Sequence, residues 1–423
     1  MLKEYRVFIS KKWPLILGIL FLLIIAAALR RHTIDFYPFW CISRELLCQN
    51  LDLYKDKPAF SYPPFFYCII VFFAQFTFRT AQALWMGFSV LLLSWTAFLS
   101  LKLMNKGALS GEHKFGTSKW SSAYLPVILG FFIIMDNLNL GQSNLLVLFL
   151  CTLSTYLFEK DKPYLSGIAI AAAIAVKITP ALFLLYFLYR RGWKVFYGTL
   201  AGFALFFFLI PSLFFGFERN LNFFRDFINL VILPFARNDT IIRETVYYTH
   251  TNQSMDAFLI RHFTDYGQSA YPAYGLHKAV DPAWFTVENV KRASALIKLG
   301  LLVFFGFLFR GQRKSLRTLE YGILFLLVLF LSPSSWLNHY ALAIFTYYAA
   351  VNFRNANTTN PISRKLITFG LILAFAFTAT CGFGLTPLQM EFAQSFSGMF
   401  VGHFLLLVCM TLAYILGRKK NNN

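Results

Sequence analysis

One carboxylate of the chain stands where a long apolar run ends. Asp35 follows the apolar residues 13–29, and Arg30 and Arg31 lie between the two. A carboxylate at the edge of a membrane is partly withdrawn from water, which makes it a better proton acceptor than a fully solvated one. Asp35 is therefore a candidate general base. The alternative is a structural carboxylate paired with Arg30 or Arg31.

A lysine interrupts another apolar stretch. Lys177 lies in the sequence Ala-Val-Lys-Ile-Thr-Pro, which ends at Pro180. A cation within the membrane costs about 2.5–3.5 kcal/mol, so it should face the interior of a helix bundle and have an anionic partner. Pro180 removes a backbone donor and bends the helix there. A phosphate group fits this position, and the alternative is a lysine whose amine reaches the lipid headgroups.

Two polar segments further along the chain carry groups that bind phosphates and sugars. In the first, Asn252-Gln253-Ser254 can bind sugar hydroxyls or cap a helix, and Arg261 can hold a phosphate bidentately. In the second, Trp336 can stack on a sugar face, and His339 can orient an acceptor or contact a lipid phosphate. An interfacial Trp beside a solvated His is the alternative for the second segment.

The segment Gly141-Gln142-Ser143-Asn144 places two amides among apolar residues. Gln142 and Asn144 can hydrogen-bond a substrate, or they can join two helices within the membrane.

The composition shows which elements must position these residues. The chain is 57% hydrophobic and 19% aromatic, and its 14% of charged residues compares with about 25% in soluble domains. It is therefore a membrane protein. The net charge of +20 comes from Lys and Arg that flank apolar runs, as at 190–191 and 418–420, which is typical of cytoplasmic loops. Nucleic-acid binding is not expected, and the six scattered Cys predict no metal site.

A membrane-spanning helix needs ~20 apolar residues, and the chain offers about twelve such stretches (range about 11–13) with both termini cytoplasmic. The first is predicted to be a retained helix, because no small-residue cleavage site follows it. The candidate spans are 13–29, 61–78, 81–103, 122–138, 142–158, 164–190, 195–216, 293–309, 320–333, 338–352, 365–384 and 396–416.

Strict alternation of these spans conflicts twice with the positive-inside rule. It places the basic loop 102–119 outside and the polar segment 141–144 inside. A broken or re-entrant helix near 137–144, or around Pro180, would relieve both conflicts. Such breaks are tolerated where protein or a water-filled cavity surrounds them.

The chain has no detectable repeat, so a single membrane domain is predicted for residues 1–423. Its exterior parts are a first loop at 30–61, which contains Asp35, and a large loop at 217–291. The C-terminal helices at 293–416 follow.

Taken together, the motifs resemble those of glycosyltransferase family 87, a polyprenol-phosphate-mannose-dependent α-mannosyltransferase-like group of the GT-C superfamily. One departure is that Asn338 replaces the first of two histidines that the family often has after the Trp. The motifs occur in the family's order, as Asp35-Phe36-Tyr37, Tyr62-Pro63-Pro64, Gly141-Gln142-Ser143-Asn144, Gly167 to Lys177 and Pro180, Asn252-Gln253-Ser254 with Arg261, and Ser332-Pro333 with Trp336 and His339.

The resemblance implies an all-α polytopic GT-C fold with short exterior juxtamembrane helices in a plasma (inner) membrane of bacterial type. It implies that a hexose, expected to be mannose, passes from a polyprenyl-phosphate donor to a lipid or glycan acceptor at the exterior face. Asp35 would be the general base of an inverting displacement. A donor with one phosphate needs no metal, so neither a metal nor a cofactor is expected.

The same resemblance assigns the remaining candidates. Lys177 and Arg261 would stabilise the departing phosphate, and His339 and Trp336 would position phosphate or sugar. Further donor-binding candidates are Gln142, Asn144, Asn252 and Gln253, and other possible site residues are Phe36, Tyr37, Tyr62 and Ser254.

Two other classes of protein remain open. An O-antigen ligase or polymerase also has many spans and one large exterior loop, but it uses pyrophosphate-linked oligosaccharides and lacks the boundary Asp-Phe pair. A transporter or lipid flippase would have paired broken helices in two related halves, and the sequence has a single Lys-Pro interruption.

Overall fold

The computed structural model describes residues 35–48, 52–54, 62–107, 119–234, 249–264, 285–310, 316–356, 360–382 and 386–419. Within these ranges the regular elements are helices, and one isolated β-bridge joins Asn252 to Trp336. The predicted all-α class is confirmed for this part of the chain. The predicted first span at 13–29, and Arg30 and Arg31, lie outside it.

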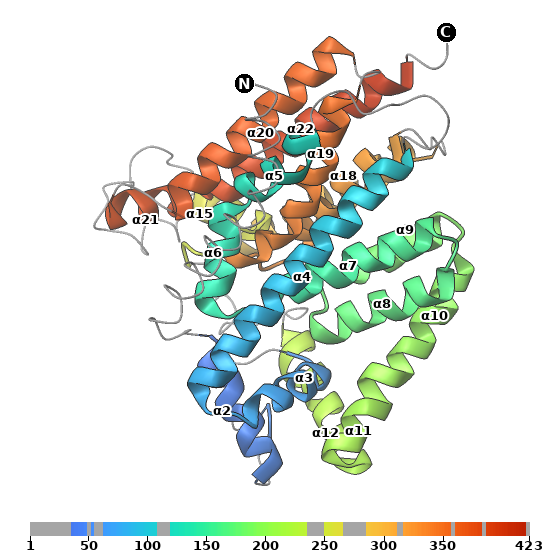
Figure 1. Ribbon diagram of the computed structural model, residues 1–423. Coiled ribbons are helices and arrows are strands. Elements are labelled where there is room, and N and C mark those ends of the chain that lie inside the picture. Colours follow the sequence, from blue (N-terminus) through green and yellow to red (C-terminus); the bar gives the residue numbers. More distant parts are fainter. Residues whose placement is uncertain are drawn as a thin grey trace, which may run out of the picture.

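The helices assemble into a bundle (Figure 1). The first ten are α2 (Phe36–Cys48), α3 (Pro64–Ala74), α4 (Phe78–Gly107), α5 (Lys119–Leu129), α6 (Phe131–Leu140), α7 (Asn144–Glu159), α8 (Pro163–Val176), α9 (Ala181–Tyr189), α10 (Trp193–Phe203) and the π-helix η1 (Ala204–Leu209). Next are α11 (Ile210–Phe215), α12 (Phe217–Asp226), η2 (Phe227–Ile232), α15 (Met255–Phe263), α17 (Val287–Leu308), α18 (Arg317–Leu331), the 3-10 helix η7 (Leu337–Leu342), α19 (Ala343–Asn355), α20 (Pro361–Gly382), α21 (Pro387–Ser395) and α22 (Gly398–Lys419).

Four helical segments of the described chain are long and apolar enough to cross a membrane. The bent pair α5–α6, with an angle of 58° between its two parts, is a fifth. Helices α3, α7 and α8 are apolar but shorter. This is the architecture of a polytopic membrane protein. The four segments are Phe78–Met104, Trp193–Phe215, Pro361–Gly382 and Gly398–Gly417.

Helix α7 joins two polar ends of the molecule. At its first residue, the Asn144 side chain accepts a hydrogen bond from Lys177 (2.8 Å). At its last residue, Glu159 forms an ion pair with Arg317 (3.1 Å). The 16 residues of α7 separate these ends by about 24 Å. We call the first the site end and the second the basic end.

The predicted single span at 164–190 is wrong. Helix α8 brings the chain to the site end at Lys177, and α9 then returns to the basic end, where the Phe187 ring packs against Phe158 of α7 (4.8 Å between centroids). The segment is therefore a hairpin of two helices. Pro180 occupies the N-cap of α9, where its fixed φ suits a helix start and its missing N–H costs nothing.

The predicted span at 61–78 is also wrong. Its helix α3 has 11 residues and does not run from the site end to the basic end. Both of its ends lie near the site end. Before the helix, the Tyr62 hydroxyl donates to the Gln142 side chain (2.8 Å). Near its other end, Phe73 packs against Trp85, whose ring N–H donates to the Gly141 carbonyl (2.9 Å).

These two corrections remove both conflicts with the positive-inside rule. Because Trp85 anchors the start of α4 at the site end, Lys102 lies about 26 Å further along the helix, toward the basic end. The segment 141–144 lies at the site end. The predicted breaks occur at both places, near 137–144 and at Pro180. The first is made by Gly141, whose φ of 70° ends α6 in the left-handed conformation that glycine adopts freely.

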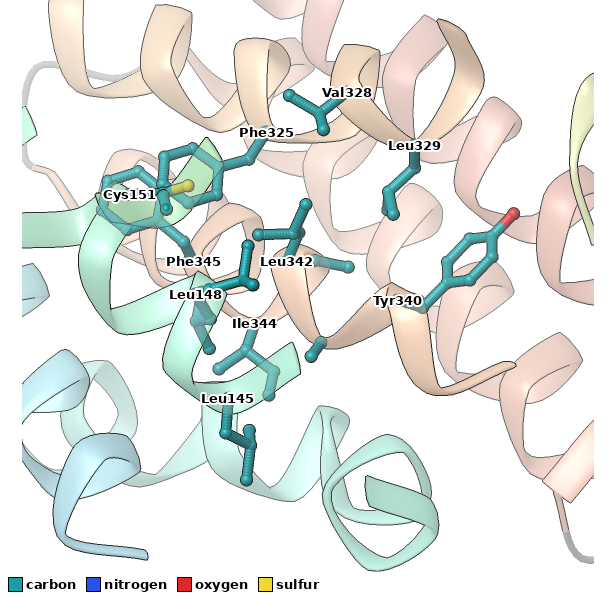
Figure 2. Close-up of a cluster of buried hydrophobic side chains, with 14 of the residues drawn as sticks. Leu145, Leu148, Cys151, Phe325, Val328, Leu329, Tyr340, Leu342, Ile344 and Phe345 are labelled. Atoms are coloured by element: carbon teal, nitrogen blue, oxygen red, sulfur yellow. The ribbon is translucent and has the colours of Figure 1, made fainter. Parts of the chain in front are cut away.

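The core nearest the site lies between α7, α18 and the η7–α19 segment, as Figure 2 shows. Leu145 and Leu148 of α7 face this core, and the rings of Phe325 and Phe345 stack within it (4.1 Å). These contacts fix the start of α7 against α18 and η7, the helices on either side of Trp336, of which η7 contains His339.

Helices α8 and α10 pack backbone to backbone. A Cβ on Gly167 would lie 2.1 Å from the Val195 carbonyl oxygen, and one on Gly198 would lie 2.2 Å from the Tyr164 carbonyl oxygen. Small residues allow this approach, as in other membrane helix pairs. Gly167, one of the motif residues, therefore allows α8 to pack closely on α10, and this packing positions Lys177 at the end of α8.

Candidate functional site

Asp35 directly precedes helix α2 and lies against the end of α6. Its backbone N–H donates to the Leu140 carbonyl (3.2 Å), and its Oδ2 accepts a hydrogen bond from the Gln142 amide (2.6 Å). The side chain is half-buried. Within the described residues Oδ1 makes no hydrogen bond, which leaves one carboxylate oxygen for a substrate.

Tyr62 orients the amide that holds Asp35. Its hydroxyl donates to Oε1 of Gln142 (2.8 Å) and accepts from the Ser143 hydroxyl (3.3 Å). The carbonyl side of Gln142 is thereby satisfied, so its NH2 group faces Asp35. Tyr62 thus acts through Gln142 to set the direction of the carboxylate.

Lys177 occupies the other side of this polar network. Its Nζ donates to Oδ1 of Asn144 (2.8 Å), contacts Nε2 of His339 (2.6 Å), and lies 5.7 Å from the centre of the Tyr62 ring. It interacts electrostatically with Asp35. Among the described residues Lys177 forms no ion pair, so its charge has no contacting counter-ion.

His339 receives the lysine on one ring nitrogen. Its Nε2 lies 2.6 Å from Lys177 Nζ, and its Nδ1 accepts a hydrogen bond from the Trp336 N–H (3.2 Å) and lies 3.3 Å from the Ser334 carbonyl oxygen. The ring therefore links Lys177 to the turn between α18 and η7.

A cluster of three amides supports Lys177 from behind. The Asn144 NH2 group donates to the side-chain oxygens of Asn137 (3.1 Å) and Asn338 (2.9 Å), and Asn137 donates to the Asn338 carbonyl (2.9 Å). Asn338 is the residue that replaces the first family histidine, and here it orients Asn144 toward the lysine. The sequence prediction missed Asn137 and Asn338 as site residues, although both stand in polar interruptions of apolar runs.

A small cavity borders Lys177 and His339. It has room for about one water molecule, so it does not accommodate a hexose as it stands. Its lining residues are Asn144, Val147, Lys177, Thr179, Val328, Leu329, Ser332, Ser335, His339 and Leu342.

The Asn252–Ser254 motif holds the turn that carries His339. Ser254 caps α15 by accepting from the Ala257 N–H (3.1 Å), and Asn252 Oδ1 accepts from the N–H groups of Ser254 (3.0 Å) and Ser335 (3.1 Å). The Gln253 N–H donates to the Ser335 carbonyl (2.7 Å). Helix capping, one of the two roles considered for this motif, is present.

Arg261 and Gln253 are engaged within the protein. Arg261 donates to the carbonyls of Thr249 (2.9 Å) and Asn252 (2.8 Å) and to the Ser397 hydroxyl. Gln253 is fully buried. Its NH2 group donates to the Gln394 carbonyl (2.8 Å), and its Oε1 accepts from the Met399 N–H in the first turn of α22 (3.2 Å). The structure does not bring these two side chains into contact with Lys177.

The ring of His262, beside Arg261, is neutral at neutral pH. Burial lowers the pKa of His262 below its ordinary value and the charge of Arg261 adds to this shift, while a hydrogen bond to the Phe258 carbonyl opposes it. Arg261 is thus the positive charge of this cluster.

The two aromatic residues after Asp35 differ in role. Phe36 is fully buried and stacks on Trp85 (5.6 Å), which fixes the start of α2. Tyr37 is 50% exposed and meets the Phe78 ring edge-on (5.0 Å). Trp336 is half-buried, and its backbone pairs with that of Asn252. No group of three or more His, Cys, Asp or Glu side chains that could hold a metal occurs in the described ranges.

Comparisons with known proteins identify the family of the chain. The model of glycosyltransferase family 87 matches residues 60–333, which is more than half of the chain. A polyprenol-phosphate-mannose-dependent alpha-(1-2)-phosphatidylinositol mannoside mannosyltransferase from Mycobacterium tuberculosis (strain ATCC 25618 / H37Rv) is 38% identical over 72 residues. That match covers 17% of this chain and 16% of the relative's length. No solved structure matches. On the extent of the family match, the chain belongs to glycosyltransferase family 87, which confirms the predicted enzyme class, a hexosyltransferase.

Proposed function

We propose that this protein transfers a hexose, expected to be mannose, from a polyprenyl-phosphate carrier to a hydroxyl of a lipid or glycan acceptor. One observation carries the proposal. Asp35 and Lys177 share a polar network in which, among the described residues, one carboxylate oxygen makes no hydrogen bond and the cation contacts no counter-ion. A base and a phosphate-binding cation are the two groups that the reaction needs. The name of the mycobacterial relative supports both the carrier and the sugar.

The reaction requires one displacement. The acceptor oxygen attacks the anomeric carbon while Asp35 takes the proton of the acceptor hydroxyl. The bond from the anomeric carbon to the phosphate oxygen breaks, and its electron pair leaves with the lipid phosphate. That phosphate is a weak base and needs no general acid, but its charge needs stabilisation, which Lys177 supplies. A β-linked donor gives an α-linked product. The donor requires neither a metal nor a cofactor.

The residues around these two groups act as positioning residues. Gln142 and Tyr62 direct the carboxylate, and Asn144 and His339 direct the ammonium group. We assign Arg261 to the support of the turn that carries His339 and Trp336, in place of the phosphate contact predicted for it, because its guanidinium already donates to protein oxygens.

We place the site end on the exterior face. The basic end carries Arg190-Arg191 and Arg317, and the positive-inside rule assigns such an end to the cytoplasm. The first predicted span and the helices that run between the two ends then give about twelve crossings of an inner membrane of bacterial type. These helices are α4, α5–α6, α7, α8, α9, α10–α11, α17, α18, α19, α20 and α22.

In this arrangement α2, α3, α12, α15 and α21 are short exterior helices of one GT-C domain that covers residues 1–423. The exterior regions are 30–61 and 217–291, and the C-terminal helices occupy 293–416.

The purified full chain in detergent, given a panel of polyprenyl-phosphate hexoses and a lipid extract of its source membrane, tests the proposal. We expect mass spectrometry to show transfer of one hexose, and Asp35→Asn to abolish it while donor binding persists. The control is Asp161→Asn, the same substitution at an exposed position next to α8. Transfer from pyrophosphate-linked carriers alone would favour a ligase or polymerase, and the absence of transfer without a sealed vesicle would favour a transporter.

A further inference from the structure

Asp136 is a carboxylate beside the site that the displacement does not use. It lies on α6, four residues before Leu140, whose carbonyl accepts the hydrogen bond from the Asp35 N–H (3.2 Å). Residues four apart share one face of a helix. Asp136 therefore lies about one helical turn before the residue that Asp35 contacts, and the two carboxylates interact electrostatically.

The side chain of Asp136 is half-buried and has no hydrogen bond or ion pair within the described residues. Other acids of the bundle are paired: Asp256 with Lys298 (2.7 Å) and Glu159 with Arg317 (3.1 Å). A carboxylate withdrawn from water without a partner destabilises the protein, so its place beside the reacting base calls for a ligand that supplies donors.

The charges around Asp136 identify that ligand. A phosphate would be repelled by two neighbouring carboxylates and attracted to Lys177 on the other side of Gln142. A hydroxyl group is neutral and donates to a carboxylate. Asn139, three residues after Asp136 and also without a side-chain partner in the described chain, adds an amide to the same face of α6.

We propose that Asp136 accepts a hydrogen bond from a second hydroxyl of the acceptor, next to the hydroxyl that Asp35 deprotonates, and so selects which hydroxyl receives the sugar. The acceptor would then be a carbohydrate or polyol headgroup that presents neighbouring hydroxyls. This inference rests on the proposed function, and it makes Asp136 a specificity-determining residue.

The test uses the full chain in detergent with polyprenyl-phosphate mannose and increasing amounts of source-membrane lipid extract. For Asp136→Asn we expect kcat/KM for the acceptor to fall roughly 10- to 100-fold, because a hydrogen bond to a charged group is lost. The KM for the donor should not change, and the single product linkage should become a mixture. Asp136→Glu should restore part of the linkage specificity, and Asp161→Asn should match the wild type.

The outcomes separate the inference from the function on which it rests. If the wild type transfers mannose and Asp35→Asn does not, but Asp136→Asn keeps the wild-type acceptor KM and a single linkage, the inference is overturned and the function stands. An Asp136→Asn protein whose donor KM rises as much as its acceptor KM overturns it as well. If the wild type transfers no hexose from any polyprenyl phosphate, both fail. Thermal melting of each variant shows that it is folded.

Discussion

Replacing Lys177 by Ala removes a cation that contacts no counter-ion in the described part of the chain. A hydrogen bond between a charged donor and a phosphate is worth about 1.5–3 kcal/mol, and the loss of one donor to a developing charge lowers a rate about 10²- to 10³-fold. We therefore expect kcat/KM for the polyprenyl-phosphate donor to fall by about 10²- to 10³-fold in Lys177→Ala.

The substitution should change the free energy of unfolding much less than it changes the free energy of activation. Truncation leaves Oδ1 of Asn144 and Nε2 of His339 without the lysine, which costs about 1 kcal/mol each if water does not replace it. Lys177 has no ion pair within the described residues, so removal of its half-buried charge raises the free energy of unfolding by a comparable amount. The two effects offset each other, so the Tm should stay within a few degrees of the wild type.

The assay is transfer of labelled mannose from polyprenyl-phosphate mannose over a range of donor concentrations, beside a thermal melt of the same preparation. Lys162→Ala, at an exposed lysine before α8, is the control. Lys177→Arg should not restore activity, since the cavity has room for about one water and the guanidinium is larger than an ammonium group. Wild-type kinetics in Lys177→Ala, or a loss of rate that a large fall in Tm explains, would refute the phosphate role.

The other predictions concern the base, the supporting turn and the helix packing. Asp35→Asn should lower kcat by about 10²- to 10⁴-fold with donor binding intact, measured by turnover and by titration of the donor; a near-normal kcat would exclude it as the base. Arg261→Ala should destabilise the protein by about 2–4 kcal/mol, because it leaves carbonyls of the supporting segment without donors, and thermal melting should show this with the donor KM unchanged. A raised donor KM at an unaltered Tm would instead support the phosphate contact that the sequence predicts for Arg261. Gly198→Ala should prevent normal packing of α8 on α10 and reduce the yield of folded protein in detergent, whereas Gly300→Ala, with open space around it, should not; equal yields would contradict the close contact.

The sequence identifies the polar network well because an apolar environment makes polar residues conspicuous. Lys177 and Gln142 stand out in apolar runs, and each needs a partner that lipid cannot provide. The sequence does not show which group each polar side chain binds. Arg261 and Gln253 have the same side-chain types as sugar- and phosphate-binding residues, yet in the structure they bind backbone groups of the protein itself.

The path of the chain through the membrane was harder to predict. The stretch 164–190 is longer than one span and shorter than two full ones, and hydropathy alone favours a single helix. Two short helices become possible because α8 packs on α10 through glycines and α9 packs on α7, so that protein surrounds the turn at Pro180. Such tertiary contacts are not visible in a hydropathy profile.

The two breaks explain why a site forms at this end of the bundle. In an unbroken helix Gln142 and Asn144 would point about 200° apart, away from a common ligand. The left-handed turn at Gly141 ends α6 before them, so that Gln142 reaches Asp35 while Asn144 begins α7 and reaches Lys177. The hairpin at Pro180 likewise brings Lys177 to this polar network. A continuous helix would leave Lys177 in the middle of the membrane, and the turn instead carries it to the end of the bundle where Asp35 lies.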